Sequence, residues 1–129
     1  MRYLIFALLI FVGCTSEQVN IAGDVPFCSL GFTSYSLEFH GDSTMYIVKN
    51  GGGEVFFDRA FFMVDGKTRE FQASARMGYR ARIDIDRKFI ADLAGANFVS
   101  WRPSNYTNAH YNFTGEHFRR LQEYGEYFK

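Results

Sequence analysis

The chain has 129 residues with 14 basic and 14 acidic side chains, so its formal net charge is zero. This length suits a single domain, and the balanced charge argues against nucleic-acid binding, which requires a basic face. Aromatic residues make up 19% of the chain, most of them Phe and Tyr. Because Phe and Tyr favour pleated, half-buried surfaces, the composition indicates a β-rich fold.

The N-terminal segment, MRYLIFALLIFVGC, has the layout of an export signal. Arg2 supplies a short positive region, and residues 4–12 form an unbroken apolar run. The run is shorter than the roughly 20 residues that span a bilayer. Its length matches the apolar core of a secretory signal peptide.

The end of this segment resembles the lipobox of bacterial lipoproteins, with Gly13 as the small residue and Cys14 as the cysteine to be lipidated. The family usually has Leu where this chain has Phe11. The resemblance implies cleavage between Gly13 and Cys14 and acylation of Cys14, palmitate included, and several acyl chains anchor a protein stably. Thr15 follows where an Asp would imply inner-membrane retention, so the resemblance favours the periplasmic face of the outer membrane. An ordinary cleaved signal is the alternative.

This interpretation divides the chain into a signal peptide (residues 1–13), a lipidated tether (14–25) and a β-rich globular domain (26–129). A flexible tether of this length covers only about 15–20 Å on average, which keeps the domain near the membrane. Cys28 is expected to be a buried small apolar residue, with an intermolecular bond as the other outcome. If Cys14 is not lipidated, a Cys14–Cys28 disulfide becomes the alternative.

Alternation of apolar and polar residues predicts strands joined by tight turns. The turns are expected at 40–43, at the Asn-Gly-Gly-Gly run 50–53 and at 65–67, because Asn and Gly readily accept positive φ. Asp58 and Arg59 interrupt one apolar run, which predicts a bulge or turn there. The expected strands are 35–39, 44–49, 54–64, 68–75, 79–84, 97–102 and 106–113.

Two short helices are predicted near the C-terminus, at 87–94 and 115–124, with Asp86 and Thr114 as N-caps and Gly95 as the stop of the first. Strands joined by tight turns pair antiparallel. We therefore expect a mainly β fold, a β-sandwich or flattened barrel, with two short helices in the C-terminal half. The expected buried helix positions are Phe89, Ile90 and Leu93 in the first helix and Phe118 and Leu121 in the second.

Arg80, Arg82 and Asp84 alternate with apolar residues and are expected on the exposed face of one strand. They are our candidate contacts with a protein partner, whose carboxylates would pair with Arg80 and Arg82, and a solvated strand face is the alternative. Asp84 and Asp86 place two carboxylates on one side of an extended chain. We interpret them as a charged strand face and a helix cap rather than a cation site.

No catalytic or metal-binding pattern is present in the sequence. The chain has no local nucleophile motif, and its three histidines lack the spacing of a metal site. His110 and His117 flank the junction between the last strand and the last helix. Solvated surface histidines are the expectation for His40, His110 and His117. We therefore expect no enzyme activity, no metal and no cofactor.

From residue 44 onward the order of features resembles the β-sandwich proteins of the bacterial envelope that include type VI secretion-associated lipoproteins and invasion-associated proteins. The similar segments are VDGK (64–67), FIADLAGAN (89–97), WR (101–102) and YNFTG (111–115). The chain departs from the secretion-associated group because it has no C-terminal cysteine. The resemblance implies a β-sandwich and an accessory role in a secretion or envelope system.

We expect a membrane-anchored, non-enzymatic envelope lipoprotein that presents its β-domain to a protein partner in the periplasm. An inhibitor of a cell-wall hydrolase of the lysozyme type, or a phage-exclusion lipoprotein, is the alternative, since small lipid-anchored lysozyme inhibitors are similar in size and class. A third hypothesis, an enzyme or small-ligand binder, requires a concave pocket with convergent polar groups.

Overall fold

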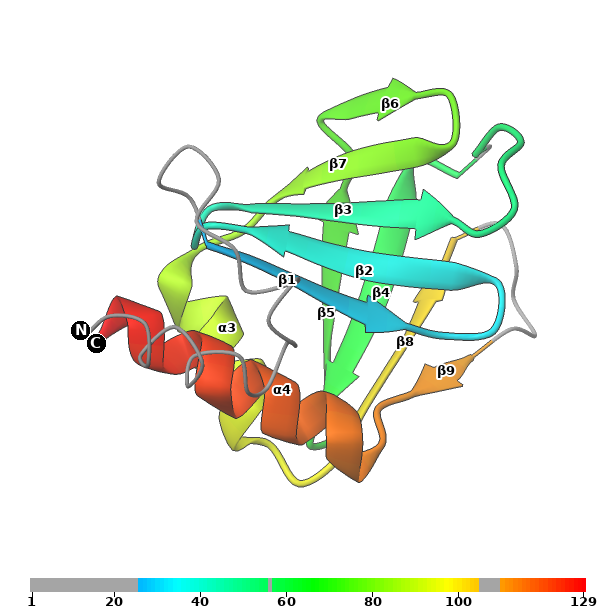
Figure 1. The fold of residues 1–129 in the computed structure, drawn as a ribbon. Coiled ribbons are helices and arrows are strands. Elements are labelled where there is room, and N and C mark those ends of the chain that lie inside the picture. Colours follow the sequence, from blue (N-terminus) through cyan, green and yellow to red (C-terminus); the bar gives the residue numbers. More distant parts are fainter. Residues whose placement is uncertain (1–25, 56, 105–109) are drawn as a thin grey trace.

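The computed structural model describes residues 26–55, 57–104 and 110–129, which form two antiparallel β-sheets and two α-helices in the C-terminal half (Figure 1). The predicted signal peptide and tether, with Gly13 and Cys14, lie outside the described residues. The mainly β prediction is confirmed. Of the two forms expected, the structure is a sandwich, since the described strands pair within two separate sheets and do not close a barrel.

The first sheet has five strands in the order β1-β2-β3-β7-β6. Its long hairpin pairs β2 with β3 from Tyr35 opposite Lys49 to His40 opposite Thr44. The strands are β1 (Phe27–Gly31), β2 (Tyr35–His40), β3 (Thr44–Lys49), β6 (Ala75–Met77) and β7 (Arg80–Asp84). The sequence predicted β2, β3 and β7, whereas β1 and β6 were not predicted.

The second sheet has the order β5-β4-β8-β9. Its central hairpin turns at Asp65 and Gly66, whose φ angles of 49° and 87° are both positive. Two positive φ angles define the tight turn that matches the twist of paired strands, and Asp-Gly is among its favoured pairs. The strands are β4 (Arg59–Val64), β5 (Lys67–Gln72), β8 (Val99–Pro103) and β9 (Tyr111–Asn112).

The apolar run 54–64 is not one strand. Only its second half is β4, while Val55 and Phe57 are buried without belonging to a strand. The predicted strand 106–113 is described only in part, because residues 105–109 lie outside the described residues.

Both helices begin at the predicted caps. Asp86 precedes α3 (Arg87–Gly95), and its Oδ1 accepts the backbone N–H of Phe89 at 2.8 Å. Thr114 precedes α4 (Gly115–Gly125), which continues into the 3₁₀ helix η1 (Glu126–Phe128). In the part of the chain that the structure describes, no helix is long and apolar enough to cross a membrane.

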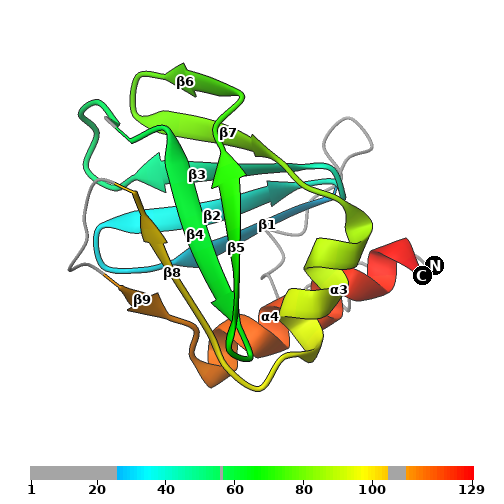
Figure 2. The same cartoon turned by 180° about the vertical axis from the view of Figure 1, so that it is seen from behind.

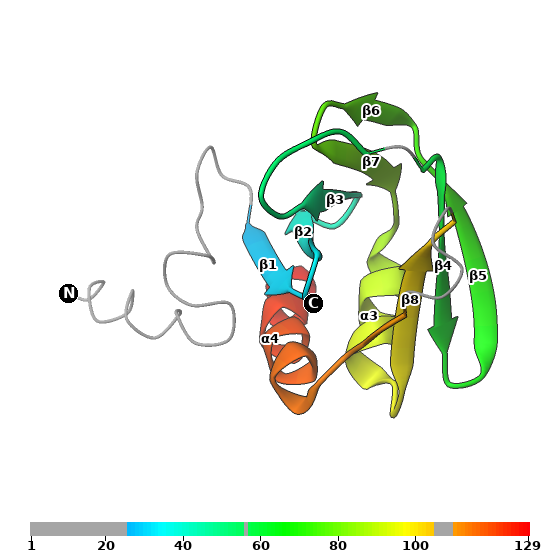
Figure 3. The same ribbon diagram turned by 90° about the vertical axis from the view of Figure 1, so that its right-hand side faces the viewer.

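The core lies between the two sheets, and α3 and α4 close its lower end (Figures 2 and 3). Aromatic rings form its centre, because Phe62 stacks on Trp101 at a centroid distance of 5.7 Å and meets Phe89 edge-on at 5.5 Å. The helix stripes are confirmed for Phe89, Ile90, Leu93 and Leu121, whereas Phe118 is only half-buried. Tyr124, which was not predicted, is fully buried.

Cys28 is fully buried on β1, as expected, and it is part of a disulfide. The sequence offers Cys14 as its other cysteine. Because Cys14 lies outside the described residues, its lipidation stays a prediction.

Candidate functional site

The outer face of β7 carries the residues predicted to contact a partner. Ala81 and Ile83 are buried, so Arg80, Arg82 and Asp84 share the opposite face, as expected from the alternation. Arg82 Nε lies 3.4 Å from Asp84 Oδ1. Contact with a partner stays a prediction.

Cross-strand neighbours extend this face with aromatic rings that sequence reasoning missed. The Arg80 guanidinium lies 4.2 Å from the centroid of the Tyr46 ring on β3. The His40 ring meets Tyr46 at 5.0 Å and Phe27 at 4.8 Å, edge-on in both cases. We call this group, Arg80, Arg82, Asp84, Tyr46 and His40, the β7 face.

The outer face of the four-stranded sheet carries a comparable pair. The Arg102 guanidinium lies 4.4 Å from the centroid of the Phe61 ring. Met63 beside it is 37% exposed. This second arginine–aromatic pair is a matched control for the β7 face.

Asp84 and Asp86 have the separate roles expected for them, because Asp84 pairs with Arg82 and Asp86 caps α3. No group of three or more His, Cys, Asp or Glu side chains within the described ranges is arranged to hold a metal ion.

The expectation of a solvated surface residue is wrong for His117. Its Nδ1 accepts the backbone N–H of Thr114 at 3.0 Å, and its Nε2 lies 2.8 Å from the carbonyl oxygen of Gly31. An imidazole with Nδ1 as acceptor carries its proton on Nε2, so Nε2 donates to Gly31. Burial lowers the pKa of His117, and the bond to Gly31 offsets part of that effect.

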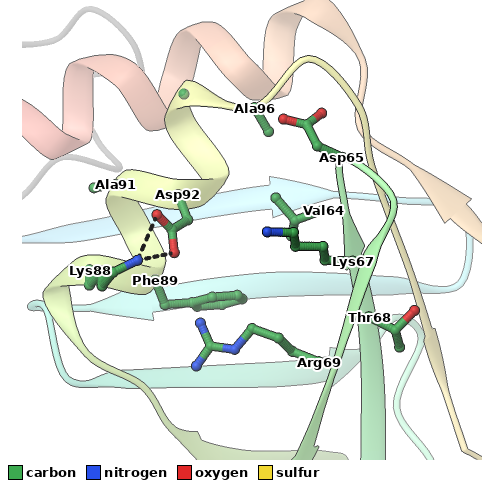
Figure 4. Close-up of a pocket in the computed structure, with 11 residues that line it drawn as sticks. Val64, Asp65, Lys67, Thr68, Arg69, Lys88, Phe89, Ala91, Asp92 and Ala96 are labelled. Carbon is green, nitrogen blue, oxygen red and sulfur yellow. Dashed lines mark hydrogen bonds and ion pairs between the residues drawn. The ribbon is translucent and has the colours of Figure 1, made fainter.

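A cavity of about 650 Å³ lies between the β4–β5 hairpin and α3 (Figure 4). We call it the β5–α3 pocket. Nothing in the sequence pattern indicated it, because its two walls are separated along the chain. Its lining residues are Val64, Asp65, Lys67, Thr68, Arg69, Lys88, Phe89, Ala91, Asp92, Gly95 and Ala96.

Two cations extend from β5 toward α3 at this pocket (Figure 4). Lys67 and Arg69 lie opposite Val64 and Phe62 of β4, so their side chains share the face of the sheet that carries the core residues. The Arg69 guanidinium also lies 5.0 Å from the centroid of the Phe89 ring. An edge strand therefore presents positive charge on its inward face.

The other charged groups of the pocket already have partners. Lys88 Nζ lies 3.0 Å from Asp92 Oδ2. Asp65 Oδ1 accepts the backbone N–H groups of Asn97 and Phe98, both at 2.9 Å. Among the described residues, by contrast, no carboxylate lies within 4.0 Å of the charged groups of Lys67 or Arg69.

A second cavity of about 550 Å³ lies between α3 and α4, and its charges are paired. Arg87 at its rim binds both Asp42 Oδ2 and the carbonyl oxygen of Phe128, each at 2.9 Å. Glu126 pairs with Lys129 at 3.0 Å. Of these two cavities beside α3, the β5–α3 pocket is therefore the one with cations available to a ligand.

No protein-family model, no curated protein and no solved structure matches this chain.

Proposed function

We propose that the protein is exported to the bacterial cell envelope and held on a membrane by lipid on Cys14, with the periplasmic face of the outer membrane favoured. There it presents the β7 face to a protein partner that carries acidic side chains. The role is binding rather than catalysis. It includes an accessory function in a secretion or envelope system.

The Arg80–Tyr46 pair carries the binding part of this proposal. Arg and Tyr are enriched among the residues that dominate protein–protein binding, and here they lie together on the outer face of a sheet. No described helix packs over this face, since α4 lies along β1 at the edge of the sheet (Figures 1 and 3). Arg80 also has no carboxylate of its own within the described residues, so a partner's carboxylate can bind it.

The disulfide at Cys28 bears on the anchoring part. Disulfides persist in oxidising compartments, so it supports export. It also competes with lipidation if the second sulfur is that of Cys14, because one sulfur cannot carry both bonds. A secreted, disulfide-bonded form is therefore the rival of the anchored form.

Mass spectrometry of the protein from bacterial cells tests the anchor. We expect an N-terminal peptide that begins at Cys14 and carries diacylglycerol, so that any disulfide of Cys28 is made to another chain and not to Cys14. The variant Cys14→Ser should leave the membrane fraction. A disulfide-linked Cys14 peptide recovered from the soluble fraction would overturn the anchored form.

Photo-crosslinking in the periplasm tests the β7 face. A crosslinker placed at position 82 should capture a specific partner, and Arg80→Gln should reduce that capture at least fivefold. Arg102→Gln, which alters the matched pair on the opposite sheet, should leave capture unchanged. Equal loss of capture in both variants would contradict the assignment of the β7 face.

A lysozyme assay at stoichiometric dose tests the inhibitor alternative, since full protection of lysozyme's substrate would favour it.

A further inference from the structure

We propose that the β5–α3 pocket binds a small organic anion with an apolar body, such as a medium-chain carboxylate. This inference is independent of the anchor and of the β7 face. It rests on two cations that have no carboxylate partner in the described part of the chain and on the apolar residues beside them in one concave site.

The anionic end of the ligand is placed by Lys67 and Arg69. Residues two apart on a strand project from the same face about 6–7 Å apart, which lets both cations reach one carboxylate. A guanidinium presents paired N–H donors that match the two oxygens of a carboxylate. Arg69 lies against the Phe71 and Phe89 rings at 4.9 and 5.0 Å, so its fork is already oriented.

The apolar body of the ligand is placed by the floor and the helix wall. Phe89 lies under the Arg69 guanidinium and is itself fully buried, so the apolar surface open to a ligand comes from its neighbours. Val64, Ala91 and Ala96 add aliphatic carbon around it. The volume of about 650 Å³ falls in the range of small-molecule sites, which are mostly apolar with a few placed polar groups.

A purely structural role for the two cations makes a different prediction. Inward-pointing charges on an edge strand prevent pairing with another chain. That role explains why Lys67 and Arg69 are charged, yet it requires no ligand. It predicts that replacing them promotes self-association and that no anion binds.

The proposal is tested by nuclear magnetic resonance titration of the mature protein, purified from bacterial cells after any processing of its N-terminus. The probes are hexanoate, its neutral analogue hexanamide and inorganic phosphate. We expect hexanoate to shift the amide signals of Val64, Lys67 and Phe89 and to bind at least tenfold more tightly than either other probe. Lys67→Gln should weaken hexanoate about tenfold, and Lys67→Arg should restore it.

Two further variants separate the parts of the site. Ala96→Phe keeps every charge but places a ring in the cavity from the end of α3 (Figure 4), so it should abolish hexanoate binding, and thermal unfolding checks that the fold is kept. Arg76→Gln removes an exposed cation on β6 and should change binding less than twofold. The proposal is overturned if hexanamide or phosphate binds as tightly as hexanoate. It is also overturned if Arg76→Gln weakens hexanoate binding as much as Lys67→Gln does. Retention on phosphatidylglycerol vesicles that Lys67→Gln reduces, without any hexanoate shift, would overturn it in favour of a membrane surface.

Discussion

Each of the two sheets has an edge strand beside a helix, but the side chains at the two edges make different contacts. On β1, side chains of α4 bind the exposed carbonyls: His117 Nε2 donates to Gly31 at 2.8 Å and Arg120 donates to Ser29 at 3.3 Å. On β5, no such bond to α3 is present among the described residues, and Lys67 and Arg69 line a cavity in its place.

The difference shows two physical solutions to one problem. An unpaired strand edge invites association with another chain, and proteins cover it or charge it. At the covered edge of β1, the His117 and Arg120 side chains of α4 are engaged in hydrogen bonds to backbone carbonyls. Charging the edge of β5 leaves a concave space in which Lys67 and Arg69 have no carboxylate partner among the described residues, and these are the groups that the proposed ligand would bind.

Removing the side chain that fastens the covered edge should have the largest effect. Tyr124 is fully buried, and its hydroxyl lies 2.7 Å from the carbonyl oxygen of Gly41 and 3.1 Å from that of Pro26. We expect Tyr124→Ala to lower the free energy of unfolding by about 3–5 kcal/mol. Tyr124→Phe, which removes only the donor, should lower it by about 1 kcal/mol.

Urea unfolding measures both changes, with Tyr127→Ala as the control. Tyr127 is 39% exposed, so its loss should change stability by less than about 1 kcal/mol. A Tyr124→Ala effect as small as that of Tyr127→Ala would show that α4 does not secure β1.

The rim of the open edge depends on Asp65. This residue caps the chain after α3 and adopts a positive φ of 49°, which Ala disfavours. We expect Asp65→Ala to lower the free energy of unfolding by about 1–3 kcal/mol, because two N–H groups lose their acceptor and the turn is strained. Asp65→Asn keeps an acceptor oxygen and tolerates this φ, so thermal unfolding should show a clearly smaller loss.

The covered edge should weaken in mild acid. Burial lowers the pKa of His117 in the folded protein below its usual value of 6.5. Between that lowered pKa and 6.5 the unfolded chain binds more protons than the folded one, so stability is full above 6.5 and falls as the pH drops through this window. Nearby, Arg120 reinforces the lowered pKa of His117 and Glu116 opposes it.

Urea unfolding at a series of pH values should show this loss in the native protein. The variant His117→Gln should lose most of the dependence, while His110→Gln at an exposed position should keep it. An unchanged dependence in His117→Gln would assign it to other groups.

The smallest effect is expected from the ion pair that borders the open pocket. Lys88 and Asp92 are four residues apart on α3, and the Lys88 side chain is 78% exposed. Such pairs contribute about 0.3–0.5 kcal/mol, so Lys88→Ala should barely change thermal unfolding. It should also free Asp92 to repel an anion in the pocket, which the hexanoate titration measures as weaker binding.

Features set by short stretches of sequence were predictable. The bounds of β3 match the predicted strand, and Asp86 and Thr114 cap the helices as expected. The same holds for the Asp65-Gly66 turn. Alternation, caps and turn residues each act over a few positions, so a single sequence records them.

Features set by neighbours in space were not predictable. The short strand β1 forms against β2, and β6 forms against β7, so neither has a strong pattern of its own. The pocket depends on the register that turns Lys67 and Arg69 inward. Tyr124 is an exception, because its position three residues after Leu121 continues the apolar stripe of α4 and could have been read as buried.

Tyr124 also determines how a mechanical force applied at the start of the domain is distributed over the fold. The carbonyl oxygen of Pro26, where the described chain enters β1, accepts the N–H of Gly41 and lies within reach of the Tyr124 hydroxyl. Tension arriving at Pro26 is thus shared at once with the β2–β3 turn and with α4. An edge strand that would otherwise peel away one bond at a time is loaded in parallel with a helix, which makes this entry point mechanically resistant.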